Sequence, residues 1–149
     1  MATASGGAPM NRLGFLLAVR GAITDARVRS ALGVTGLSPR HAMTLMYLDD
    51  AGPVSQQKLA ELLAVDPSQL VAILNDLERD ELARRRRDPA DRRRHIVEIT
   101  SAGATTLQIT STALTRCEDE LFADLTQNER ELLSGLLNRI RTADGQYNC

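Results

Sequence analysis

Apolar residues recur at steps of three and four positions along most of this chain, which is the spacing typical of amphipathic helices. The longest such run begins near Met10 and ends at Leu32, before a turn region that contains Gly33 and Gly36. Five further runs follow, over about residues 38–48, 55–63, 67–77, 101–125 and 126–140. The pattern therefore predicts a mainly helical protein.

Three of these predicted helices begin with a recognisable start signal. The pairs Ser38-Pro39 and Asp66-Pro67 each combine a good N-cap with a proline at the first helical position. Thr126 and Glu129 have the spacing of a capping box, in which each side chain bonds to the backbone of the other residue. These signals indicate where the helices start.

One stretch departs from the helical spacing. Leu82–Arg87 is short and Arg-rich, residues 88–91 have the composition of a turn, and β-branched residues recur from Arg94 to Thr100. We therefore predict a β-hairpin with a polar tip. Two short helices followed at once by such a hairpin is the layout of a winged helix-turn-helix, so the predicted fold class is mainly α with a small β-hairpin wing.

Length and composition limit the architecture further. The 149 residues fit a single domain, and a content of 43% hydrophobic but only 3% aromatic residues predicts an aliphatic core. Leu13–Val19 is too short to span a membrane and no secretory signal accompanies it, so we expect a cytoplasmic protein. Cys117 falls on an apolar helical seam and is expected in the core rather than as a redox switch, whereas Cys149 is terminal.

Charge is distributed unevenly along the chain. The formal net charge is −1, but residues 84–95 contain seven arginines against Asp88 and Asp91, which gives a local charge of +5. The rest of the chain carries −6. Such a concentration of arginine in an otherwise acidic chain indicates a site for a polyanion, although a solvated charge run is the alternative.

A set of short motifs in this region resembles the MarR family of winged helix-turn-helix transcription regulators. The motifs are Leu37-Ser38-Pro39, Gly52-Pro53-Val54-Ser55-Gln56, Leu59-Ala60-Glu61-Leu62, Asp66-Pro67-Ser68, Leu77-Glu78-Arg79, Asp88-Pro89-Ala90-Asp91-Arg92-Arg93 and Ile99-Thr100-Ser101-Ala102-Gly103. They occur in the order and spacing of the family, over roughly residues 37–107. The resemblance implies a sequence-specific DNA-binding regulator, expected to be a repressor that a small ligand releases.

The helix predicted over 67–77 is expected to enter the major groove of double-stranded DNA. Its apolar stripe leaves an opposite face that meets base edges and phosphates. The candidates on or beside this face are Ser68, Gln69, Ala72, Asn75, Asp76 and Arg79. Ser55 and Lys58, in the preceding helix, are expected to touch the DNA backbone.

The arginine-rich wing supplies the second set of candidate contacts. The resemblance implies that Arg93 enters the minor groove and that Asp91 orients it. Arg87, Arg92 and Arg94 are expected to contact phosphates. The chain departs from the family where it has Ala72 and Asp76 in place of basic residues, and Glu81 in place of glycine. We expect the latter change to remove the favourable left-handed end of the helix.

The remaining segments are assigned to assembly and regulation. We expect residues 1–9 to be a flexible arm, residues 10–36 and 101–145 to form dimerisation helices, and residues 37–100 to form the winged helix-turn-helix. A homodimer would bind a pseudo-palindromic operator with half-sites about 10 base pairs apart. In the family a small aromatic or anionic effector enters a cleft beside the dimerisation helices, for which Arg20, His41 and Tyr47 are the candidates.

Two other functional classes fit the sequence less well. An enzyme has little support, because the two histidines lack metal-ligand spacing and no phosphate-binding loop or nucleophile motif occurs. We therefore expect no catalytic site, metal or cofactor. A winged-helix module that binds protein instead of DNA is the alternative, and Asp76 and Glu81 favour it.

Overall fold

The structure is a computed structural model, and it describes residues 11–140. Over these residues it contains six helices and three short strands, which are α1 (Leu13–Leu32), α2 (Pro39–Ala51), β1 (Val54–Ser55), α3 (Gln56–Leu63), α4 (Pro67–Arg79), β2 (Ala83–Arg87), β3 (His95–Ile99), α5 (Ser101–Leu121) and α6 (Gln127–Leu137). The expected arm at residues 1–9, the end of the range 101–145 and Cys149 lie outside the described residues.

The predicted start signals are confirmed. The Ser38 hydroxyl accepts from the His41 N–H at the start of α2. Asp66 and Gln69 form a capping box at the start of α4. At the start of α6 the Thr126 N–H donates to Glu129 Oε2 at 2.7 Å, which completes the predicted capping box. Each signal acts locally, which is why the sequence alone reveals it.

The predicted hairpin is part of a three-stranded antiparallel sheet in the order β1-β3-β2. The extra strand β1 pairs Val54 with Val97 and Ser55 with Ile96. Its two residues are too few to show an alternating pattern. Strand β3 begins at His95 rather than at Arg94, because Arg94 closes the turn: its carbonyl accepts from the Asp88 N–H at 3.0 Å.

The core is aliphatic, as the composition predicts. Its fully buried aliphatic side chains come from α1, α2, α3, α4 and β3, and they are Leu32, Leu45, Leu48, Leu59, Leu70, Leu74, Leu77 and Val97. Leu107 and Cys117 of α5 are also buried, and Cys117 is thus a core residue. The helix-turn-helix and the sheet therefore share one hydrophobic core with part of α5.

Three predicted helix ends are corrected. Helix α1 begins at Leu13 rather than Met10. Helix α5 ends at Leu121, so Leu125 lies in the turn before the extended Thr126, whose cap geometry breaks the helix. Ile140 lies beyond the end of α6, where the Ile140 N–H bonds back only three residues, to the Leu137 carbonyl. Apolar spacing alone thus extends these helices beyond the residues at which their backbone stops being helical.

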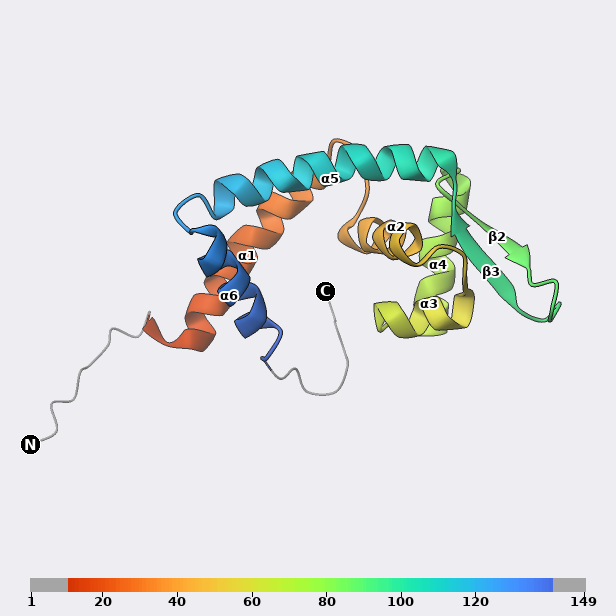
Figure 1. The fold of residues 1–149 in the computed structure, drawn as a ribbon, viewed down its shortest axis with the longest axis horizontal. Helices are drawn as coiled ribbons and strands as arrows, with labels where there is room; N and C mark the ends of the chain where they lie inside the picture. Colours follow the sequence, from red (N-terminus) through yellow and green to blue (C-terminus); the bar gives the residue numbers. More distant parts are fainter. Residues whose placement is uncertain (1–10, 141–149) are drawn as a thin grey trace, which may run out of the picture.

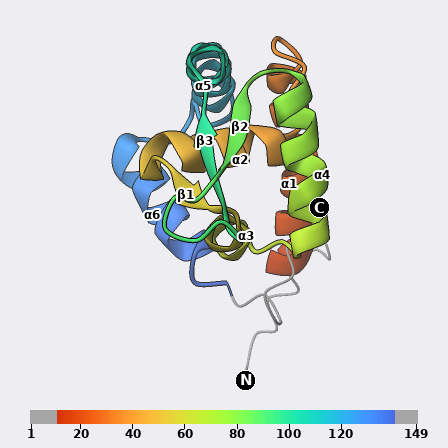
Figure 2. The same cartoon turned by 90° about the vertical axis from the view of Figure 1, so that its right-hand side faces the viewer.

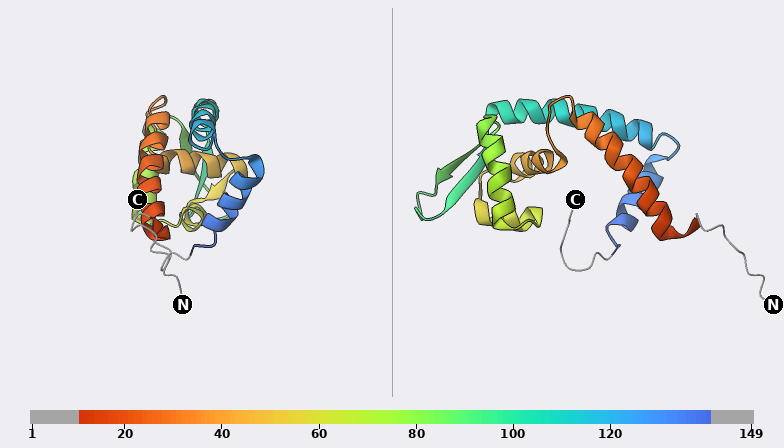
Figure 3. Two further views of the ribbon diagram at one scale, coloured as in Figure 1. Left: turned by 90° about the vertical axis from the view of Figure 1, so that its left-hand side faces the viewer. Right: turned by 180° about the vertical axis from the view of Figure 1, so that it is seen from behind.

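The long helix α5 connects two parts of the molecule (Figure 1). At its N-terminal end lie the sheet and α4, and at its other end α1 and α6 extend away from it, as the view from behind also shows (Figure 3). Figure 2 looks onto the end that carries the sheet, with α4 on one side of it. Among the described residues, no helix is long and apolar enough to cross a membrane.

Candidate nucleic-acid interface

Helix α4 has one buried and one exposed face, as its pattern predicts. Leu70, Ile73, Leu74 and Leu77 are buried. Five candidate contact residues are exposed, namely Ser68, Gln69, Ala72, Asn75 and Arg79, and Asp76 is half-buried. Since the apolar stripe anchors the helix to α2, α3 and the sheet, the opposite face is free to approach a ligand.

Two of these candidates are engaged in the cap of α4. The Ser68 hydroxyl and the Gln69 backbone N–H both donate to the Asp66 carboxylate, and they hold the pKa of that carboxyl below its ordinary value. Gln69 Oε1 accepts from the Asp66 N–H at 3.3 Å. A bidentate contact between Gln69 and adenine uses both Oε1 and the NH₂ group, so it requires Oε1 to leave the capping box. The NH₂ group takes no part in the capping box.

The negative charge of Asp76, the acidic candidate on α4, is offset by neighbouring side chains. Asp76 accepts from His41 Nε2 at 3.1 Å and from Arg79 Nη1 at 3.0 Å. His41 Nδ1 in turn lies 2.7 Å from the Ser38 hydroxyl. Asp76 is thus part of a chain of contacts that joins α2 to α4, and Arg79 offsets its charge beside any approaching phosphate.

The seven arginines of the wing fall into two groups. Arg84 and Arg86 pair with Glu98, Arg85 pairs with Glu78, and Arg94 lies 3.5 Å from Asp91. Within residues 11–140 no carboxylate pairs with the other three, which are Arg87, Arg92 and Arg93 at or next to the tip. The uncompensated positive charge of the wing is therefore concentrated at its tip.

The tip is shaped by two aspartates. Asp88 Oδ1 accepts from the Ala90 N–H at 2.9 Å, and Asp91 Oδ1 accepts from the Arg93 N–H at 3.0 Å. These are Asx turns, in which the side chain imitates a backbone acceptor. Asp91 thus orients the backbone of Arg93, while the guanidinium nearest to it belongs to Arg94. Arg87 Nη1 adds a bond to the Arg92 carbonyl at 2.8 Å.

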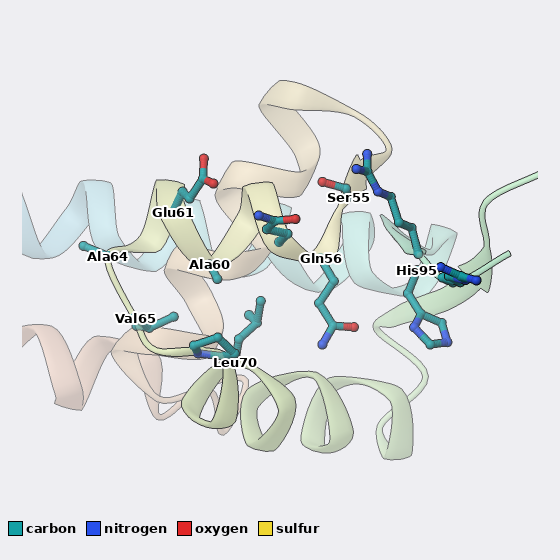
Figure 4. Close-up of a pocket in the computed structure, with 12 residues that line it drawn as sticks. Ser55, Gln56, Ala60, Glu61, Ala64, Val65, Leu70 and His95 are labelled. Carbon is teal, nitrogen blue, oxygen red and sulfur yellow. The ribbon is translucent and has the colours of Figure 1, made fainter. Parts of the chain in front are cut away.

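A groove of about 580 Å³ lies between α3, the start of α4 and the wing. Ser55, Gln56, Arg93, Arg94 and His95 are among its lining residues, and Figure 4 shows Gln56 reaching toward α4 from the start of α3, with Ser55 beside it. Ser55 also caps α3 by accepting from the Lys58 N–H at 3.1 Å. The groove thus brings Ser55 together with two of the predicted wing residues.

Lys58 is not part of that groove lining. Its ammonium group lies 3.3 Å from Glu61 on the same helix, with both side chains 58% exposed. An ion pair this exposed is weak, so it does not prevent Lys58 from contacting a phosphate.

The left-handed end of α4 is retained, contrary to expectation. Glu81 has φ +59°. The Leu82 N–H bonds to the Leu77 carbonyl and the Glu81 N–H to the Glu78 carbonyl, which is the Schellman pattern. The Thr100 hydroxyl donates to the Glu81 carbonyl at 2.6 Å. This contact from Thr100, the N-cap of α5, thus supports a conformation that glutamate by itself disfavours.

A second cleft, of about 380 Å³, lies between α1 and the helix-turn-helix. Tyr47 lines it, but Arg20 and His41 do not. The cations at its edge are Arg29 and Arg40, which the sequence reasoning missed. Arg40, Met43 and Tyr47 lie at helical spacing on the face of α2 opposite to its buried residues, and this spacing is the signal that points to them.

Comparisons with known proteins agree with this geometry. A model described as the MarR family matches residues 35–94. The chain is 32% identical to a putative transcriptional regulatory protein for the hcr operon of Thauera aromatica, over 94% of this chain and 85% of that protein. It is 33% identical to the HTH-type transcriptional repressor NicR of Pseudomonas putida, over 68% of this chain and 65% of that protein.

Among solved structures, the transcriptional repressor CouR bound to a 23-mer DNA duplex has a similar fold, with a TM-score of 0.80 and 30% identity over 85% of this chain and 90% of that one. The family model spans α2, the helix-turn-helix and the tip of the wing, which are the parts that carry the exposed face of α4 and the arginines. This chain therefore belongs to the MarR family of transcription regulators.

Proposed function

We propose that the protein is a dimeric repressor that binds a pseudo-palindromic DNA operator and leaves it when a small aromatic acid binds. The observation that carries the proposal is the division of the wing arginines, because only those at and beside the tip lack a carboxylate partner among the described residues. Arginine heads that are not neutralised are the groups that attract phosphates and a narrow minor groove.

Helix α4 is the reading element in this proposal. Its exposed face carries Ala72 and Asn75 beyond the first turn and Ser68 and Gln69 within it. A methyl group, an amide and a hydroxyl are the groups that distinguish bases in the major groove. Arg93 enters the minor groove, and Ser55 and Arg94 contact phosphates from the two sides of the groove between α3 and the wing.

The dimer is proposed from apolar surface that one subunit leaves uncovered. On α1 the exposed apolar residues include Phe15 at 59% and Ile23 at 48%, and on α6 they include Leu132 at 62% and Leu136 at 48%. Helix α6 has no buried residue at all. Apolar side chains gathered on two helices at the same end of α5 favour burial against a second copy.

The effector cleft is the one that Tyr47 lines. Met43, Leu63, Val65 and Ile73 supply apolar wall, and the Tyr47 hydroxyl, Arg40 and the Arg29–Asp25 ion pair supply polar groups. This combination fits a small aromatic ring that bears a carboxylate or a phenol. Because the cleft includes residues of α1, α2, α3 and α4, a bound ligand changes the position of the reader relative to the dimerisation end.

Selection of bound duplexes from a random pool tests the DNA-binding part. We expect one pseudo-palindrome with half-sites about 10 base pairs apart, bound in the presence of excess competitor DNA. Recovery of no preferred sequence would contradict the proposal and favour the protein-binding alternative.

Gel shifts on the selected duplex then test the effector with a panel of benzoates and hydroxybenzoates. The expected result is release of the DNA together with a raised melting temperature of the free protein, since a ligand that binds the folded state stabilises it. Tyr47→Phe and Arg40→Gln should weaken this response, whereas Arg20→Gln, outside the cleft lining, should keep it. A full response in the first two variants would place the effector elsewhere.

A further inference from the structure

Arg85 joins the wing to the exposed face of α4. Its backbone N–H and Nε both donate to Glu78 Oε1, at 2.8 and 3.0 Å, and Nη2 donates to Glu78 Oε2 at 2.6 Å. The same Nη2 also donates to Asn75 Oδ1 at 2.6 Å. The side chains of Arg85 and Glu78 are only 22% and 32% exposed, so this is a partly shielded junction between β2 and α4.

The junction stays charged over the ordinary pH range. Hydrogen bonds from Arg85 hold the pKa of Glu78 below its usual value, and Glu78 raises the pKa of Arg85. A guanidinium has donors only, so the atom of Asn75 that faces it is the amide oxygen. The NH₂ group of Asn75 must then point away from Arg85, on an exposed residue of the reading face.

We propose that Arg85 is a specificity-determining residue, because by holding Asn75 Oδ1 it presents Asn75 to DNA as a hydrogen-bond donor. The inference rests on the DNA-binding function proposed above. In the major groove guanine offers two acceptors, N7 and O6, whereas adenine offers one acceptor and one donor. A free asparagine pairs with both groups of adenine, but one whose oxygen is held by Arg85 favours guanine.

Removal of the clamp tests this assignment. Arg85→Met keeps much of the side-chain length but no donor, so Asn75 can rotate and pair with adenine. At the symmetric pair of positions whose preference Asn75→Ala abolishes, we expect the guanine-to-adenine preference to fall by about tenfold or to reverse. Arg84→Met is the matched control, since the neighbouring Arg84 is 69% exposed and pairs with Glu98 rather than with α4, and it should keep the parent ranking.

A second variant keeps the test independent of how well Arg85→Met folds. Asn75→Asp has nearly the same shape and still accepts from Arg85, but its outer oxygen is an acceptor. The preferred base at the same positions should change from guanine to one that offers a donor, cytosine or adenine. Melting curves of each variant accompany the measurement, which is selection from a random pool followed by competition between duplexes that differ at these positions.

The possible outcomes distinguish an error in the role of Arg85 from an error in the proposed DNA-binding function. If the parent selects an operator but prefers adenine at these positions, the role of Arg85 is wrong. The same holds if a normally melting Arg85→Met keeps the parent ranking, if Asn75→Asp still prefers guanine, or if Asn75→Ala changes no position. If the parent selects no sequence, the proposed DNA-binding function fails and this inference fails with it.

Discussion

Individual residues at the junction of α4, β2 and α5 hold the reading helix in place. Thr100 accepts from the Gly103 N–H at 2.9 Å and donates through its hydroxyl to the Glu81 carbonyl. Its backbone N–H donates to the Leu82 carbonyl at 3.1 Å. Thr100 therefore connects the end of α4 to the start of α5, which gives a physical reason for Thr100 and Gly103 in the Thr100-Ser101-Ala102-Gly103 motif.

Gly103 is required at this junction. A Cβ atom added to it would lie 2.0 Å from the Leu82 carbonyl oxygen and 2.7 Å from Ile99 Cγ1. We predict that Gly103→Ala lowers the free energy of unfolding by about 3 kcal/mol, because backbone must move to admit the methyl group. Urea denaturation measures it. Ala102→Gly, at the exposed neighbour, should cost less than about 1 kcal/mol, and equal costs would show that no close contact limits Gly103.

At Glu81 a substitution is expected to have the opposite effect, an increase in stability. It holds a left-handed conformation at φ +59° that glycine adopts without strain. We predict that Glu81→Gly raises the free energy of unfolding by about 0.5–1 kcal/mol. Asp80→Gly is the control, since Asp80 has φ −87° and glycine there brings only a loss of stability. A destabilised Glu81→Gly would mean that the Glu81 side chain makes a contribution larger than the backbone strain.

Among the elements, the wing has two parts with different roles: its base holds the hairpin in place, and its tip carries the arginines proposed to contact DNA. At its base, Arg84 and Arg86 of β2 pair with Glu98 of β3, and Arg85 of β2 joins the hairpin to Glu78 of α4. Its tip is folded by Asp88 and Asp91 through backbone N–H groups, so that arginine side chains remain available there. A rigid base with an available cationic tip suits insertion into a groove of DNA.

Arg93→Ala tests the tip. We predict that it weakens specific binding by roughly 1 to 3 kcal/mol and lowers the log–log salt slope by about one per subunit, because one phosphate-neutralising charge is lost. Arg84→Ala removes the same charge from the base of the same hairpin and should change binding much less, since Glu98 already offsets it. Titrations at several salt concentrations measure both, and equal losses would mean that only the total charge of the wing matters.

Asp91 is tested by two substitutions that separate charge from geometry. Asp91→Asn keeps an oxygen acceptor for the Arg93 N–H but removes the negative charge, so we predict binding at least as tight as that of the parent. Asp91→Ala removes both and should bind more weakly. The same titrations measure these affinities, and melting curves control for collapse of the hairpin. Weak binding by Asp91→Asn would assign the role of Asp91 to its charge on Arg94 instead.

At the scale of the whole molecule, the exposed apolar residues of α1 and α6 are the surface that we propose for dimerisation. They lie at the end of α5 remote from the sheet, so two copies joined there would carry two separate reading heads (Figure 1). Such an arrangement matches a two-fold symmetric site on DNA.

Leu136→Glu tests this interface. We predict a shift from dimer to monomer in sedimentation velocity, together with loss of operator binding, because a buried charge without a partner strongly disfavours association. Asn128→Glu, an exposed polar position near the start of the same helix, should remain dimeric. A parent protein that sediments as a folded monomer at micromolar concentration would overturn the proposal.

Much of this architecture follows from the sequence by itself. The helical periods, the N-caps at Ser38, Asp66 and Thr126, the apolar seam with Cys117 and the exposed face of α4 are confirmed. Each depends on residues within about two turns of one another, so spacing along the chain is enough to reveal it.

Only the tertiary structure decided which partner each charged side chain takes. The sequence shows seven arginines in one cluster, but Glu98 and Glu78, which neutralise those at the base, come from the facing strand and from α4. The same holds for β1, for the residues that line the cleft beside Tyr47 and for the left-handed Glu81, whose carbonyl accepts from the Thr100 hydroxyl. Side chains far apart in sequence meet only after the chain has folded, and electrostatic pairing depends on those distances rather than on local charge counts.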